Sequence, residues 1–224
     1  MKRIKLGDRV LPVYTKGEEI FNMVSHIVGA SFGLIVTIIC VTFAIMHNNG
    51  YGIVSAIIYG ISMMVLYIMS SLYHGLRANS TAKKVFQIID HCTIFVLIAG
   101  SYTPFTLVTF REYDPILGWS MFAFIWGMAI LGIVLNAIDL KRYKIFSMIC
   151  YLAMGWCIIF KVSILPGLLG IPAFVLLVAG GVVYTIGAIF YGLGRNHKYM
   201  HSIFHLLIVL ASILQFLCIV MSVM

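Results

Sequence analysis

The chain has 224 residues, of which 62% are hydrophobic and only 10% are charged, and its mean hydropathy is +1.07. A soluble domain of this length has no core large enough to bury so much apolar surface. The composition therefore excludes a soluble protein and indicates an integral membrane protein. The formal net charge is +8, but no nucleic-acid-binding motif accompanies it, so we expect no nucleic acid as a partner.

Seven long apolar stretches predict an all-α fold, a bundle of seven transmembrane helices. Most of them reach or exceed the roughly 20 residues with which a helix crosses a bilayer. In chain order they are Ile20–Met46, Gly52–Gly75, Val85–Phe110, Leu117–Ile138, Phe146–Ile164, Ile171–Tyr191 and His201–Met224. The residues before the first stretch are basic and do not resemble a removable signal peptide. We interpret residues 1–224 as a single seven-helix membrane domain, with 1–18 as a basic cytoplasmic tail.

The lysines and arginines fall almost entirely on one side of this topology. Thirteen of the fifteen lie in the tail or in the second–third, fourth–fifth and sixth–seventh connections, and only Arg111 and Lys161 lie on the opposite side. Because basic loops stay in the cytoplasm, the N-terminus is predicted inside and the C-terminus outside. The positive charge then lines the inner surface of the cell membrane, where anionic lipid is the expected partner.

A pair of histidines, His201 and His205, stands at the start of the last apolar stretch. Positions four apart on a helix differ by only about 40° in direction, so both imidazoles project from one face and can bind one metal ion. The alternative is a pair of interfacial histidines that contact lipid headgroups. Ionisable groups inside a span are costly and usually mark function, which keeps the metal site as a hypothesis.

The predicted topology brings further polar residues to the depth of this pair. His74 ends the second span, which runs from outside to inside, and Asp90 lies just within the third, which starts inside. The histidine pair opens the seventh span, also from inside. Each of these side chains needs a polar neighbour to offset its desolvation, and a bundle supplies such neighbours at one layer. We therefore expect one polar site near the cytoplasmic surface.

Three polar residues open the first span at the same level. Glu19, Asn22 and His26 lie within about 60° of one another on one helix face, and we interpret them as a structural motif beside the site. Two other histidines are left out of the ligand set. His197 falls in a basic loop, and His91 follows Asp90 directly, so about 100° of helix rotation turns it away.

Three histidines with an acid nearby are typical of a catalytic zinc site with an open fourth position. Zinc lowers the pKa of a bound water toward about 7 and polarises a carbonyl, so a hydrolysis needs little more than a base and a stabiliser. Asp90 is the candidate base. Ser70 lies four residues before His74 on the same face, where its hydroxyl could bond the water or a developing oxyanion. The alternative for Ser70 is a hydrogen bond to its own helix.

The order of these residues along the chain resembles the progestin and adipoQ receptor family, within the CREST-type membrane hydrolases, and its hemolysin III branch in particular. The resemblance covers nearly the whole chain, and the motifs are specific only when taken together. They are Glu19-x-x-Asn22-x-x-Ser25-His26; Ser70-x-x-x-His74 followed by Asp90 and Gly100-Ser101-Tyr102-Thr103-Pro104; and His201-x-x-x-His205.

The resemblance implies a site and a chemistry. From the family's adiponectin receptors and the related alkaline ceramidases it implies a zinc ion held by His74, His201 and His205. It also implies that Asp90 and Ser70 act on the zinc-bound water and that the substrate bond is a lipid amide. For the hemolysin III branch itself, the resemblance implies a role in membrane homeostasis or cytolysis.

The leading hypothesis is therefore a membrane zinc protein that hydrolyses the amide bond of a membrane lipid at the cytoplasmic side. One alternative is a receptor or sensor in which zinc only stabilises the bundle. Another is a cytolytic protein, although the fourth to sixth spans contain almost no charged residue that could line a pore. A retinal photoreceptor is excluded, because no lysine follows His201 for a Schiff base. The sequence gives no oligomeric state.

Overall fold

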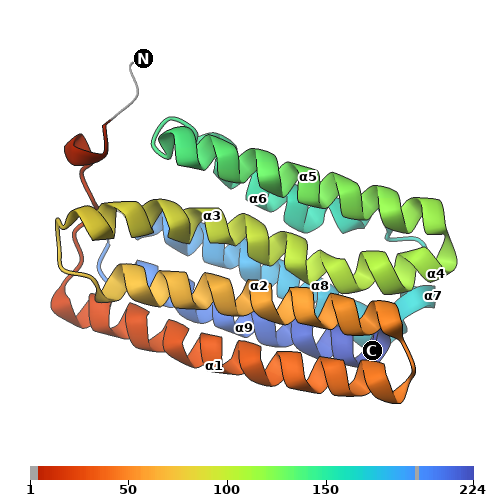
Figure 1. Ribbon diagram of the computed structural model, residues 1–224. Helices are drawn as coiled ribbons and strands as arrows, with labels where there is room; N and C mark the ends of the chain where they lie inside the picture. The colour runs from red at the N-terminus through yellow and green to blue at the C-terminus, as the bar shows by residue number, and fades with distance from the viewer. Residues whose placement is uncertain (1–4, 195–196) are drawn as a thin grey trace.

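The computed structural model describes residues 5–194 and 197–224, and every regular element within them is helical (Figure 1). Seven helical segments are long and apolar enough to cross a membrane, which confirms the predicted fold class. They are Lys16–Met46, Gly50–Gly75, Thr81–Tyr113, Pro115–Asp139, Lys144–Lys161, Ile171–Leu193 and Met200–Ser222. The chain is thus a multi-pass membrane protein.

The first helix, α1 (Lys16–Met46), begins earlier than the apolar stretch that starts at Ile20. The cause is a capping box around Thr15. The Thr15 hydroxyl accepts the Glu18 backbone N–H, and the Glu18 carboxylate accepts the Thr15 backbone N–H at 2.8 Å. These reciprocal bonds satisfy N–H groups that a helix start otherwise leaves unpaired. Helix α1 therefore begins inside the segment 1–18 that the composition assigns to the tail.

The second and third spans form an antiparallel pair. Helix α2 (Gly50–Gly75) is followed by a short turn and by α3 (Thr81–Pro104). After Pro104 the third span continues as a π-helical segment, η2 (Phe105–Phe110), and a last turn, α4 (Arg111–Tyr113). Proline lacks an N–H for the α-helical ladder and crowds the preceding turn, which accounts for the change of helix type at this position.

The remaining spans complete the bundle. They comprise α5 (Pro115–Asp139), α6 (Lys144–Trp156) with its 3₁₀ continuation η3 (Cys157–Lys161), the short α7 (Leu165–Leu169), α8 (Ile171–Leu193) and α9 (Met200–Ser222). Gly170 separates α7 from α8 with φ 76°, a conformation that glycine adopts without steric cost. In the N-terminal segment, residues Leu6–Asp8 form the 3₁₀ turn η1.

The helices lie side by side (Figure 1). The third span is the most enclosed of the seven described spans, and α1, α5 and α8 carry many exposed large apolar side chains. Helix α1 packs mainly on α2, and α8 packs mainly on α9. Tyr67 and Phe95 are among the largest fully buried side chains of the core. Outward apolar surface is the expected arrangement where the surrounding solvent is lipid.

The two ends of the bundle differ in charge. The N-terminal segment and the α2–α3, α5–α6 and α8–α9 connections all lie at one end, and the C-terminus lies at the other (Figure 1). The first of these ends carries most of the basic residues, as the topology predicts. Lys2, Arg3 and Arg195, which contribute to that asymmetry, lie outside the described residues. Which end faces the cytoplasm stays a prediction from the distribution of basic residues.

Cysteine labelling tests this orientation. In a chain whose five native cysteines are replaced, we expect Ala78→Cys to react only with reagents that enter the cell, and Gly50→Cys to react from outside. Ala78 is exposed in the α2–α3 turn, and a side chain added at Gly50, at the opposite end, meets open space. The cysteine-free chain is the control. The reverse labelling pattern would place the polar site at the outer surface.

Candidate metal centre

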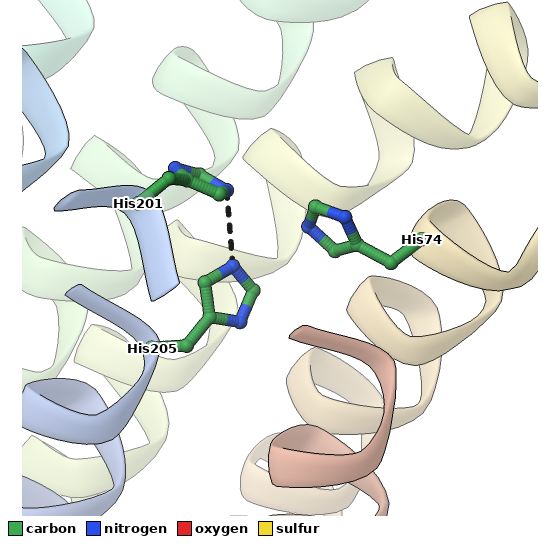
Figure 2. A group of neighbouring side chains, drawn as sticks. All are labelled: His74, His201 and His205. Carbon is green, nitrogen blue, oxygen red and sulfur yellow. Dashed lines mark hydrogen bonds between the residues drawn. The ribbon is translucent and has the colours of Figure 1, made fainter. Parts of the chain in front are cut away.

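Three histidines from two helices converge at the basic end of the bundle. His74 lies in the last turn of α2, and His201 and His205 lie in the first two turns of α9 (Figure 2). One ring nitrogen from each can be chosen so that all three atoms lie within 4.8 Å of one another. The His201 Nε2 and His205 Nε2 atoms are 3.0 Å apart. These residues could therefore hold one metal ion.

The three histidines are shielded from solvent, with relative exposures of 3%, 7% and 1% for His74, His201 and His205. The His74 ring centroid lies 5.4 Å from that of His201 and 4.9 Å from that of His205. Figure 2 shows His74 facing the pair on α9 across the space between the helices. The spacing of four residues is enough to predict that His201 and His205 share one face. The position of His74 beside them follows only from the topology of the spans.

Glu19 fixes the direction of the His74 ring. Its Oε2 lies 2.7 Å from His74 Nδ1, and its Oε1 accepts a hydrogen bond from Lys83 Nζ at 2.8 Å. The other ring nitrogen, His74 Nε2, is buried without a hydrogen-bond partner in the part of the chain that the structure describes. A carboxylate on Nδ1 leaves Nε2 with a free lone pair for a metal, an arrangement that metal-ligating histidines commonly show.

A cavity of about 440 Å³ reaches the histidines from within the bundle. His201 and His205 line it, together with Ser70 from α2 and Asp90 from α3. Most of the rest of its wall comes from α3, α6, α8 and α9, and it is mainly apolar. The predicted base and stabiliser therefore border the same space as two of the three metal-ligand candidates. The cavity therefore has a polar head, formed by Ser70, Asp90, His201 and His205, and a mainly apolar remainder.

Asp90 and its neighbour His91 both line the cavity, so the helix rotation between them does not turn His91 away from the space that Asp90 faces, contrary to the prediction from the sequence. The Asp90 Oδ2 and His91 Nδ1 atoms are 3.8 Å apart. Both nitrogens of His91 are already engaged, Nδ1 with the Gln87 carbonyl at 2.8 Å and Nε2 with the Tyr191 hydroxyl at 3.0 Å. His91 is thus not part of the converging histidine group. His197 is exposed in the turn before α9.

Asn22 and His26 lie deeper on α1 than Glu19, and both are buried. The His26 ring packs 3.9 Å from the His205 ring, measured between centroids, and lies 4.9 Å from the Tyr67 ring. His26 also lines the cavity. Glu19 and His26, two residues of the predicted motif, therefore have different roles. Glu19 contacts a ligand candidate through a hydrogen bond, whereas His26 contacts one through ring packing.

Two further residues at the centre were not anticipated from the sequence, Lys83 and Tyr14. The Tyr14 ring stacks on His201 at 4.8 Å with an interplanar angle of 19°, and it lies 5.7 Å from the His74 ring. Burial raises the pKa of the Tyr14 phenol above its ordinary value, so the group stays protonated and neutral at pH 7. Tyr14 covers the histidine group on the side of the N-terminal segment.

The N-terminal segment is held in this position by several contacts. Arg9 donates to the Gln87 side chain at 3.1 Å, and Lys84 Nζ donates to the Gly7 carbonyl. The Tyr199 backbone N–H donates to the Glu18 carboxylate at 2.7 Å, which ties the start of α9 to the start of α1. Tail residues in an apolar protein carry no periodic signal, so their packing over the centre could not be read from sequence.

The donor set matches the requirements of zinc. Imidazole nitrogen is a common zinc ligand, and three protein nitrogens with an open fourth position are found in catalytic sites. The buried, unpartnered Nε2 of His74 supports this fit, because such an atom is costly unless a ligand satisfies it. Neighbouring carboxylate, hydroxyl and apolar surfaces would let such a centre act on a hydrophobic substrate.

The fold and this histidine group define a class, the seven-helix membrane proteins with a candidate metal centre at one end of the bundle. The sequence matches the family described as haemolysin-III related over residues 14–216, and the chain belongs to that family. It is 39% identical to hemolysin-3 of Bacillus cereus over 207 residues, which are 92% of each chain.

Two further relatives widen the comparison. Identity to the hemolysin-3 homolog of Bacillus subtilis (strain 168) is 35% over 207 residues, 92% of this chain and 95% of the relative. The human monocyte to macrophage differentiation factor is 28% identical over 167 residues, 73% of this chain and 68% of the relative. The family assignment agrees with the resemblance found from the motifs.

Proposed function

We propose that this protein is a zinc-dependent hydrolase that cleaves the amide bond of a membrane lipid at the cytoplasmic side, with a role in membrane homeostasis. One observation supports this most strongly. The cavity that carries His201 and His205 at its head also contains Asp90 and Ser70, and its remaining wall is mainly apolar. A site for hydrolysis and a site for an acyl chain would then be continuous.

His74, His201 and His205 would hold the zinc ion, which when bound supplies a Lewis acid that polarises the amide carbonyl and activates water. Asp90 accepts the proton of the attacking water and passes it to the nitrogen of the leaving amine. The products are a carboxylic acid and an amine. The Ser70 hydroxyl donates a hydrogen bond to the carbonyl oxygen as negative charge develops on it.

The apolar wall has its own part in the reaction. Leu97, Phe105 and Leu177 line the cavity away from the polar head. Burial of an acyl chain against such residues contributes about 0.8 kcal/mol for each CH₂ group. This places the amide at the polar head and excludes bulk water. The expected substrate is therefore a long-chain lipid amide rather than a water-soluble peptide.

The change Asp90→Asn tests the proposed role of the base. We expect this variant to fold and to keep its zinc while hydrolysis of a long-chain amide in bilayers is lost, because an amide is a far poorer proton acceptor than a carboxylate. The measurement is zinc affinity beside turnover. Asp114→Asn is the matched control. Asp114 caps α5 at the opposite end of the bundle, where asparagine also caps well.

Other results separate the alternatives. Full zinc binding with undiminished hydrolysis in Asp90→Asn would remove Asp90 from the mechanism. A loss of zinc affinity of about 10–100-fold would instead indicate that Asp90 orients a metal ligand. If wild-type protein binds zinc and hydrolyses no lipid amide, the receptor or sensor function replaces the enzyme. Lysis of red-cell membranes without hydrolysis would favour the cytolytic function that the name of the Bacillus cereus relative suggests.

A further inference from the structure

Lys83 occupies an environment that is unusual for a lysine. Its relative exposure is 2%, although it is the third residue of α3. Lysine is almost never fully buried unless it is paired, and a positive charge in the first turn of a helix is opposed by the helix dipole. The next residue, Lys84, is half-buried and reaches the N-terminal segment instead. The burial of Lys83 therefore requires a specific compensation.

Three hydrogen bonds compensate for the burial of the Lys83 ammonium group. Its Nζ donates to Glu19 Oε1 at 2.8 Å, to the His74 carbonyl at 3.3 Å and to the Leu76 carbonyl at 3.2 Å. An ammonium group has three donors and no acceptor, so these contacts match its full capacity. The Tyr73 ring lies 5.0 Å from Nζ and adds a cation–π contact.

The acceptors show what Lys83 does. The His74 and Leu76 carbonyls belong to the end of α2, where the last carbonyls of a helix lack intrahelical partners. The Glu19 carboxylate is the group that contacts His74 Nδ1. One side chain thus holds the backbone of a metal-ligand candidate and also the carboxylate that orients its ring. Both sets of contacts therefore act on the direction in which His74 Nε2 points.

We propose that Lys83 is a positioning residue of the metal centre, acting through Glu19 and the end of α2 to aim His74 Nε2 at His201 and His205. The inference rests on the proposed zinc site but not on turnover. Without Lys83, the Glu19 carboxylate loses its ionic partner, and the end of α2 loses the donor for its carbonyls. His74 then samples ring directions that do not converge with the other two histidines.

The sign of the effect distinguishes positioning from simple charge. Removal of a cation beside a divalent ion would, by Coulomb's law alone, tighten zinc binding. Positioning requires the opposite result. We expect Lys83→Met to weaken zinc affinity by about 10–100-fold, the usual effect of losing a partner that orients a metal ligand. The measurement is competition with a chelator at fixed pH, using the full chain in lipid nanodiscs.

Lys84→Met is the matched control, because it makes the same chemical change one residue away. Its zinc affinity should fall far less than that of Lys83→Met, since the Lys84 ammonium reaches the Gly7 carbonyl and, in the contacts described for it, neither Glu19 nor a histidine. Glu19→Gln completes a double-mutant cycle. Because Lys83 acts partly through Glu19, the combined loss of affinity in the double variant should be smaller than the product of the two single losses.

Thermal unfolding separates positioning from a general loss of stability. A merely structural role would lower the unfolding temperature with and without zinc by similar amounts, whereas positioning reduces the stabilisation that added zinc provides. If Lys83→Met fails to fold, Lys83→Gln replaces it. Its amide can still donate at the end of α2 but carries no charge for Glu19, so weaker zinc binding is expected there too.

Unchanged or tighter zinc binding in the folded Lys83 variant would overturn the inference, as would losses that multiply fully in the double variant. These outcomes differ from failure of the proposed function. Wild-type protein that binds zinc without hydrolysing lipid amides contradicts the enzyme but leaves the affinity comparison intact. Wild-type protein that binds no zinc overturns both proposals.

Discussion

Replacement of any one of His74, His201 or His205 by alanine is expected to lower the zinc content of the purified chain from about one ion per molecule to nearly none. With two protein nitrogens left, the site competes poorly with water and with chelating buffer components. The three ring nitrogens lie within 4.8 Å of one another, so all three could bind the same ion. The measurement is elemental analysis after dialysis against a defined free zinc concentration.

His91→Ala is the control for this series. His91 lines the same cavity, but its two nitrogens are engaged with the Gln87 carbonyl and the Tyr191 hydroxyl. The variant should therefore keep its zinc. Unchanged zinc content in all three ligand variants would disprove the site. Loss of zinc in His91→Ala to the same extent would show that the histidines outside the converging group also matter.

Gly118→Ala is expected to destabilise the bundle by about 1–3 kcal/mol or more, the usual cost of forcing an extra carbon into a well-packed core. A Cβ at Gly118 would lie 2.6 Å from both Arg111 Cα and Arg111 N, and 2.7 Å from the Thr106 carbonyl oxygen. All three are backbone atoms, so no side-chain rotation relieves the clash. Helix α5 must move away from the π-helical end of the third span.

Gly127→Ala is the matched control on the same helix, because a Cβ there meets no atom within 4 Å. Alanine has the higher helix propensity, so this variant should be neutral or more stable by up to about 1 kcal/mol. Thermal unfolding in one detergent, monitored by loss of helical signal, compares the two variants. Equal unfolding temperatures for Gly118→Ala and Gly127→Ala would contradict the close packing of α5 on the third span.

The spans were predictable because the bilayer leaves few solutions for a chain this apolar. A run of about 20 apolar residues without water must satisfy its backbone internally, and a helix does so. The local changes within spans were not predictable from hydropathy. The start of α1 at Lys16 depends on the Thr15 capping box, and the π-helical segment follows Pro104. Both features depend on individual side chains, which a hydropathy pattern does not distinguish.

The candidate site was predictable to the extent that helix geometry alone determines it. The spacing of His201 and His205 places them on one face, and the alternation of spans brings His74 and Asp90 to the same end of the bundle. Lys83 falls in the connection between the second and third apolar stretches, where a lysine usually keeps its charged end in solvent, so the sequence does not indicate its burial. Its contacts with Glu19 and the end of α2 depend on how three helices pack.

The central claim, that three histidine nitrogens hold a zinc ion with one position left for chemistry, is tested most directly by X-ray absorption at the zinc edge of the purified wild-type chain. We predict three nitrogen scatterers with the spectral pattern of imidazole at about 2.0–2.1 Å and one further light atom. Sulfur scatterers at about 2.3 Å, or zinc surrounded only by oxygen, would contradict the account.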